Sequence, residues 1–151
     1  MQEDKKEARY KRLYTQIEEL LKKCEDETAR MATISAVLYH KMDTFFWCGF
    51  YRLIDGNLIV GPYQGPLACQ ILAKNKGVCW SGISQAKTIV VPDVEKLPDH
   101  ISCDSRSKSE IVIPYKNKNG EIAGVLDVDS DRPDSFDDTD AQFLQQIVSL
   151  L

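Results

Sequence analysis

Five cysteines are the residues of this chain with the clearest chemical potential, because a thiolate can act as a nucleophile, a metal ligand or a redox group. They are Cys24, Cys48, Cys69, Cys79 and Cys103 in a chain of 151 residues. Cys103 lies in the polar segment DHISCDSRSKSE, where core packing explains a cysteine poorly. Its neighbours His100, Arg106 and Lys108 could donate hydrogen bonds or positive charge to a thiolate. Cys103 is therefore our first candidate for a reactive thiol.

The other cysteines divide by their surroundings. Cys24 continues the apolar stripe of a predicted helix and Cys48 stands among strand aromatics, so we expect both to pack in the core. Cys69 and Cys79 lie ten residues apart in GPLACQILAKNKGVCW. For Cys79 the residues alone leave packing and a functional role equally open.

A metal site is the alternative use of these groups. Cys69, Cys79, Cys103 and His100 could form a Cys₃His set for zinc, and nearby carboxylates could hold a hard cation. Neither spacing matches an established motif, and no CxxC pair occurs. We therefore expect no metal ligands and no bound cofactor.

Carboxylates form the second group with chemical potential. Side chains alternate faces along a strand, so Asp127 and Asp129 project together from the predicted strand that contains them. Glu110 begins the neighbouring strand, and three such carboxylates could make an acidic pocket for an amine. By the same alternation Trp47 and Tyr51 share one face of an aromatic strand and could wall that pocket.

The spacing of apolar residues and the turn residues predict the helices and strands that position these groups. Apolar residues at steps of three and four predict two leading helices, and a Ser135/Asp138 capping pair predicts a final one. Asp55-Gly56 and Asn119-Gly120 predict hairpins. The stretch between Gly65 and Ser109 is predicted to be irregular. The helices are expected over 5–24, 27–42 and from 135 on, and the strands over 45–53, 57–63, 88–91, 111–115 and 121–128.

Composition limits the class of protein. Hydrophobic residues make up 43% and charged residues 28%, which is typical of a globular domain, and the net charge is −4. A nucleic-acid binder would normally carry a basic surplus. No apolar run approaches the length of a membrane span, and the first residues are too charged for a secretory signal. We expect one cytoplasmic domain over 1–151, with a helical part (1–44) and a sheet, loops and helix (45–151).

Five stretches together resemble a known family: WCGFY, GPYQG, AC-x₉-C, HISCDSRSKSEIV and GVLDVDS. The combination is similar to that of the free methionine-(R)-sulfoxide reductases, which are single GAF domains, and it covers nearly the whole chain. The resemblance implies an α+β GAF fold with an antiparallel sheet of about six strands, flanked by N-terminal helices and a C-terminal helix. Such domains are often homodimeric. Trp80 departs from the family, which usually has a small residue after this cysteine.

The resemblance also implies roles for single residues. Cys103 would be the catalytic nucleophile, and Cys69 and Cys79 would be candidate resolving cysteines, with the choice between them open. The residues that would surround the substrate are Trp47, Tyr51, Glu110, Asp127 and Asp129.

The implied reaction reduces free methionine-(R)-sulfoxide through a cysteine sulfenic acid and then an intramolecular disulfide. A thioredoxin-like dithiol would regenerate the enzyme. A carboxylic acid whose pKa is raised by its neighbours, Glu110 or Asp129, would protonate the leaving oxygen. The alternative is a non-catalytic GAF module that senses a small ligand.

Overall fold

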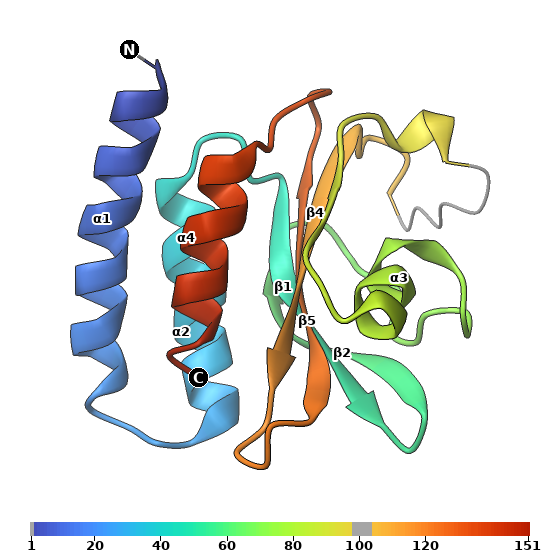
Figure 1. Cartoon of the computed structure of the whole chain (residues 1–151), viewed down its shortest axis with the longest axis horizontal. Coiled ribbons are helices and arrows are strands. Elements are labelled where there is room, and N and C mark those ends of the chain that lie inside the picture. The colour runs from blue at the N-terminus through green and yellow to red at the C-terminus, as the bar shows by residue number, and fades with distance from the viewer. Residues whose placement is uncertain (1, 98–103) are drawn as a thin grey trace.

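The structure is a computed structural model that describes residues 2–97 and 104–151, with side chains from residue 5 on (Figure 1). Its strands form one sheet in the order β2-β1-β5-β4-β3, and all neighbours pair antiparallel. The predicted α+β class is confirmed, although the described residues form five strands rather than about six. The elements in chain order are α1 (Gln2–Leu21), α2 (Glu27–Lys41), β1 (Trp47–Ile54), β2 (Asn57–Gln64), α3 (Gly77–Gln85), β3 (Ile89–Val91), a 3-10 turn (Val94–Lys96), β4 (Ser109–Lys116), β5 (Ile122–Ser130) and α4 (Asp138–Val148).

The sheet separates two layers of helices. Figure 1 shows α1, α2 and α4 on one face and α3 on the other. Because alternate strand residues face opposite sides, each face has its own apolar core. Cys48, Phe50 and Leu126 belong to the core under α1, α2 and α4, which confirms the packing predicted for Cys48. Trp47, Tyr51 and their neighbours belong to the core under α3.

A buried polar contact joins the first and last helices. Asp140 is 1% exposed and accepts hydrogen bonds from Tyr10 Oη and, at 2.8 Å, from Lys6 Nζ. Asp140 also completes a capping box with Asp137, which caps α4. The predicted Ser135/Asp138 pair is therefore wrong by two residues. The Ser135 hydroxyl instead donates to the carbonyl of Arg132 in the preceding turn.

The prediction that Cys24 packs in the core at the end of the first helix is wrong. α1 ends at Leu21 rather than continuing to residue 24, and Cys24 is exposed. The chain turns there toward α2, which is capped by Asp26, whose side chain accepts from the amide of Ala29. The carbonyl of Cys24 accepts a hydrogen bond of 2.7 Å from Arg30 Nε, so the backbone of this residue rather than its thiol makes the contact.

α3 lies inside the segment predicted to be irregular. Its N-cap residue, Lys76, makes no side-chain capping bond, and Gly77 begins the helix with φ +87°. Gly82 lets the helix approach the sheet closely, because a Cβ atom there would lie 2.9 Å from Val112 Cγ1. The helix therefore covers this face of the sheet without the sequence signals that usually mark a helix.

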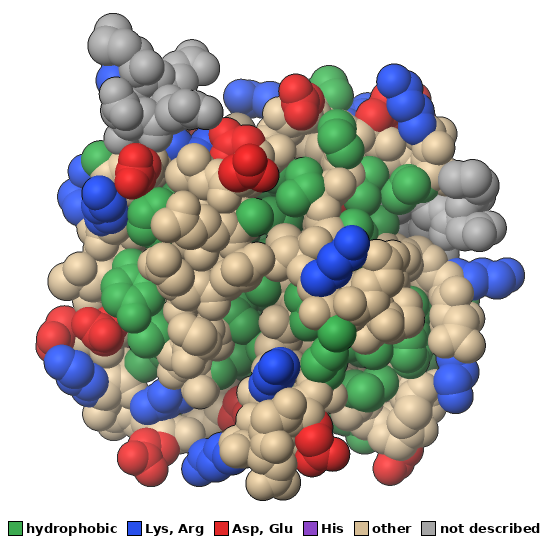
Figure 2. All heavy atoms as spheres, in the orientation of Figure 1, with side chains coloured by type: hydrophobic (Ala, Val, Ile, Leu, Met, Phe, Trp, Pro, Cys, Tyr) green, Lys and Arg blue, Asp and Glu red, His purple; other side chains and the backbone are tan. Residues whose placement is uncertain are grey.

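Charges on the surface are mixed. Figure 2 shows acidic and basic side chains interspersed around the rim of the face that it draws, with apolar groups between them. In the described part of the chain, no helix combines the length and the apolar character needed to cross a bilayer.

Candidate active site

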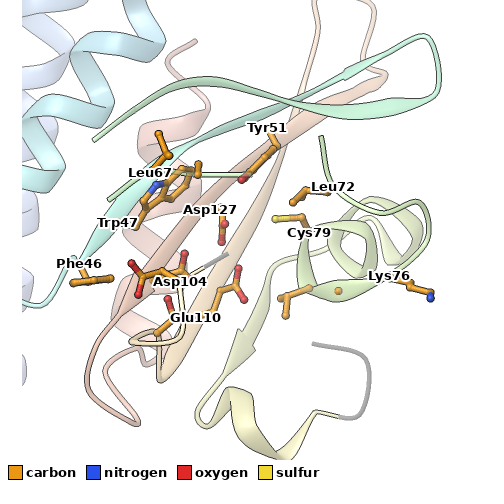
Figure 3. Close-up of a pocket in the computed structure, with 15 residues that line it drawn as sticks. Phe46, Trp47, Tyr51, Leu67, Leu72, Lys76, Cys79, Asp104, Glu110 and Asp127 are labelled. Carbon is orange, nitrogen blue, oxygen red and sulfur yellow. The ribbon is translucent and has the colours of Figure 1, made fainter. Parts of the chain in front are cut away.

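A pocket lies between the sheet and α3 (Figure 3). Its lining comes from β1, β4, β5, the start of α3 and the loops on either side. The structure brings together the five residues that the sequence suggested for substrate binding, and their role in binding stays a prediction. These residues are Trp47, Tyr51, Glu110, Asp127 and Asp129.

Strand register explains why the carboxylates meet. Glu110 on β4 pairs directly with Asp129 on β5, and Asp129 also pairs with Trp47 on β1. Asp127 lies two residues before Asp129 and therefore faces the same side. Asp127 pairs with Gly49, where a Cβ atom would lie 2.9 Å from the Trp47 ring and 2.2 Å from Tyr63 Cβ. Gly49 thus leaves room for the aromatic rings beside the carboxylates.

Burial and mutual repulsion raise the pKa of the pocket's carboxyl groups. Glu110 and Asp127 are each 5% exposed. Burial, followed by repulsion from Asp129, raises the pKa of Glu110 from 4.5 to about 8. Burial, followed by the charge of Glu110, raises the pKa of Asp127 well above its usual value of 3.8. Buried like charges cannot all ionise together. The pocket therefore offers a carboxylic acid near pH 7, that of Glu110.

Aromatic residues line the pocket beside the carboxylates and fix the loop that follows β2. The Trp47 ring stacks on those of Tyr51 and Tyr63, with centroids 5.8 and 5.1 Å apart. Trp47 Nε1 donates to the carbonyl of Pro66 at 3.1 Å, and Tyr51 Oη donates to the carbonyl of Cys69 at 3.1 Å. The same aromatics therefore wall the pocket and hold the backbone of Cys69.

Cys79 faces the carboxylates from α3. It is free, 4% exposed and hydrogen-bonded to Asp127. Burial, together with the charges of Asp127 and Glu110, raises the pKa of its thiol well above 9. A thiol in this environment stays protonated and is a poor nucleophile.

Cys69 differs from Cys79 in both exposure and bonding, since it is half-buried and disulfide-bonded. Cys103, the predicted nucleophile, and His100 lie outside the described residues. The other groups proposed near Cys103 have partners of their own. Arg106 pairs with Asp104 at 2.6 Å, and Lys108 pairs with Glu95 at 3.1 Å.

The start of α3 is a part of the site that the sequence did not reveal. Gly77 and Val78 line the pocket, and the first amides of a helix have no intrahelical acceptor. Since Lys76 provides no side-chain cap, these amides can receive an anion, and the helix dipole favours one there. Asp104 and Ser107 also line the pocket, and the sequence did not predict that they belong to the site. No sequence signal identifies them, because both come from a polar loop.

Comparisons with known proteins agree with this geometry. A model of the GAF domain matches residues 25–151. GAF domain-containing protein A of Dictyostelium discoideum is 48% identical, covering 97% of this chain and 92% of the relative. The free methionine-R-sulfoxide reductase of Escherichia coli is 42% identical, covering 82% of this chain and 74% of the relative. The crystal structure of the Neisseria meningitidis free methionine-R-sulfoxide reductase in complex with its substrate superposes with a TM-score of 0.90 at 40% identity, covering 96% of this chain and 87% of that one.

Proposed function

The chain belongs to the GAF-domain family of free methionine-R-sulfoxide reductases, and from this we propose that it reduces free L-methionine-(R)-sulfoxide to L-methionine. The observation that carries the proposal is the pocket that three carboxyl groups line beside a stacked Trp47–Tyr51 pair. The names of relatives that share most of this chain's length support the same substrate.

A free amino acid presents two opposite charges, and the pocket has a complement for each. Its ammonium group would bind among Glu110, Asp127 and Asp129, whose carboxyl groups line the pocket together. Its carboxylate would accept hydrogen bonds from the amides of Gly77 and Val78 at the start of α3. A methionine sulfoxide residue within a protein has neither charge. We therefore infer that this pocket selects the free amino acid.

Reduction would begin at Cys103, the nucleophile implied by the family resemblance. Its thiolate attacks the sulfoxide sulfur, and an acid protonates the sulfoxide oxygen. The protonated oxygen then moves from the methionine sulfur to the Cys103 sulfur as the new S–S bond breaks. Methionine leaves with the electron pair of that bond, and Cys103 becomes a sulfenic acid. Glu110 suits the role of the acid, because its pKa of about 8 keeps it protonated at neutral pH.

Cys69 is our proposed resolving cysteine. Its thiol would displace the hydroxyl of the Cys103 sulfenic acid, which releases water and forms a disulfide. Two contrasts favour Cys69 over Cys79: Cys69 is disulfide-bonded and half-buried, whereas Cys79 is free, buried and protonated by its surroundings. Cys79 would then line the substrate pocket and take no part in the redox cycle.

Regeneration needs a dithiol, and we propose a thioredoxin-like protein in the cytoplasm as its source. We also propose a homodimer as the assembled state, following the resemblance to a family that is often dimeric. No bound cofactor takes part in this cycle, because the electrons come from thiols.

The test is release of methionine from free L-methionine-(R)-sulfoxide, first with dithiothreitol and then with thioredoxin and its reductase. We expect Cys103→Ser to abolish release in both assays. Cys69→Ser should stop thioredoxin-supported turnover, while Cys79→Ser and the exposed-site control Cys24→Ser should retain it. Normal turnover by Cys103→Ser would refute the mechanism. Ligand binding without methionine release would instead favour the sensor module.

A further inference from the structure

Three side chains from three different elements converge at the base of the pocket. Cys79 of α3, Glu110 of β4 and Asp127 of β5 each offer one ligand atom, and these atoms all lie within 4.8 Å of one another. The three side chains are only 4–5% exposed, yet all line the pocket (Figure 3). This set differs from the Cys₃His set considered from the sequence, because it joins one thiol to two carboxylates.

Asp127 gives an independent sign that this place receives a ligand. Its Oδ1 atom is buried and has no hydrogen-bond partner among the residues that the structure describes. Buried polar atoms are normally satisfied, so an unsatisfied one that lines an open pocket marks a place where a ligand binds.

The described lining of the pocket contains three carboxyl groups near its base and one basic residue. Lys76 is the positively charged residue that the lining contains, and Figure 3 shows its side chain extending away from the carboxylates. Lys76 is also exposed. A ligand with positive charge would therefore match the three acidic groups electrostatically.

We propose that Cys79, Glu110 and Asp127 form a site for a divalent zinc ion, which blocks the substrate pocket when it binds. A thiolate combined with carboxylates suits zinc better than magnesium or calcium, which prefer oxygen ligands alone. Ligand atoms around one tetrahedral zinc lie about 3.5 Å apart, so small side-chain rotations bring the observed atoms into range. Binding forms one Zn–S bond and two Zn–O bonds, and it releases to solvent the thiol proton and any proton that Glu110 or Asp127 holds, while water takes the fourth position. No change of oxidation state is involved.

A bound metal ion would block the substrate pocket because it would use two of the residues that bind the substrate. This competition rests on the proposed function. Glu110 and Asp127 would bind either the ammonium group of the amino acid or the metal ion, so the two ligands should compete. Metal binding itself does not depend on whether the chain reduces methionine sulfoxide.

The test titrates the oxidised protein, in which Cys69 is already disulfide-bonded, with cobalt(II) as a spectroscopic substitute for zinc. A sulfur-to-cobalt charge-transfer band reports a bound thiolate, and the free thiols among the described cysteines are Cys24, Cys48 and Cys79. We expect a band that saturates at one equivalent, is displaced by zinc and disappears in Cys79→Ser. The control Cys24→Ser should keep it. Thermal unfolding of each variant shows whether it is folded.

Asp127→Asn separates the carboxylate from the thiol. It should weaken cobalt binding by at least about tenfold while the band at saturation remains. A band that persists in Cys79→Ser, a band lost in Cys24→Ser, or no saturable band in the wild type would each overturn the site.

A competition arm distinguishes this proposal from the proposed function. Free methionine-(R)-sulfoxide should release cobalt from the oxidised protein and bleach the band. If cobalt binds through Cys79 but the sulfoxide does not displace it, the blocking role is refuted and the metal site stands. If the protein releases methionine in the turnover assay but binds no cobalt, the metal site is refuted and the proposed function stands.

Discussion

Glu110→Gln should make the protein more stable while it removes activity, because the wild type carries a buried acid that folding must keep protonated. The pKa of Glu110 is about 8 in the folded protein, against 4.5 for an ordinary glutamate. At pH 7 the unfolded chain releases this proton and the folded chain retains it. That difference costs roughly 3 kcal/mol of stability, since each pH unit above 4.5 adds about 1.36 kcal/mol.

The sign of the pH dependence follows directly. The stabilisation that comes from holding the proton is fully present below pH 4.5 and is lost as the pH rises toward 8, above which the loss is constant. Glutamine does not titrate, so the variant should lack this slope. The two proteins should therefore be equally stable near pH 4 and differ most at pH 8 and above.

Thermal unfolding at a series of pH values measures this difference, with EDTA present to keep the pocket free of metal. For a chain of this length, about 3 kcal/mol corresponds to a rise in Tm of roughly 6–12 °C at pH 7. Glu25→Gln is the matched control, because Glu25 is exposed, and it should leave Tm within about 1 °C. If Glu110→Gln has an unchanged or lower Tm at pH 8, or keeps the wild-type slope, the buried-acid reasoning is refuted.

Two further substitutions test how the pocket is positioned. Gly82→Ala should destabilise the protein by roughly 1–3 kcal/mol and raise KM, because its Cβ would lie 2.9 Å from Val112 Cγ1 and push α3 from the sheet; urea unfolding and steady-state kinetics measure both, and wild-type values for both would contradict the close packing. Tyr51→Phe should slow disulfide formation after the first turnover, because the loop loses the bond from Tyr51 Oη to the carbonyl of Cys69. Rapid-quench measurement of free thiols tests this, with Tyr14→Phe on α1 as the control, and equal rates would contradict it.

The parts of the fold and site that sequence could predict depend on local rules. Asp127 and Asp129 share a face because side chains alternate in every strand. The Asn119-Gly120 turn predicts that Glu110 lies beside them, and in the structure Glu110 pairs with Asp129. Alternation also placed Trp47 on the pocket side and Cys48 in the opposite core.

The parts that could not be predicted depend on contacts that are distant in sequence or on weak caps. Cys24 fits a helical stripe, but α1 stops at Leu21 where the chain must turn toward α2. α3 has no side-chain cap and a glycine in its middle, and it is held in place by packing against Val112 on β4. Its uncapped start, where Gly77 meets the pocket, became visible only with the fold. The single-domain boundary of 1–151 stays a prediction.

The central claim is that this pocket recognises both charges of a free amino acid, and the most direct test compares two substrates. The measurement is kcat/KM for L-methionine-(R)-sulfoxide and for its N-acetyl derivative, which lacks the ammonium group. We predict that acetylation lowers kcat/KM by at least roughly 100-fold, because it leaves buried acidic groups facing an uncharged amide. Comparable values for the two substrates would contradict the claim.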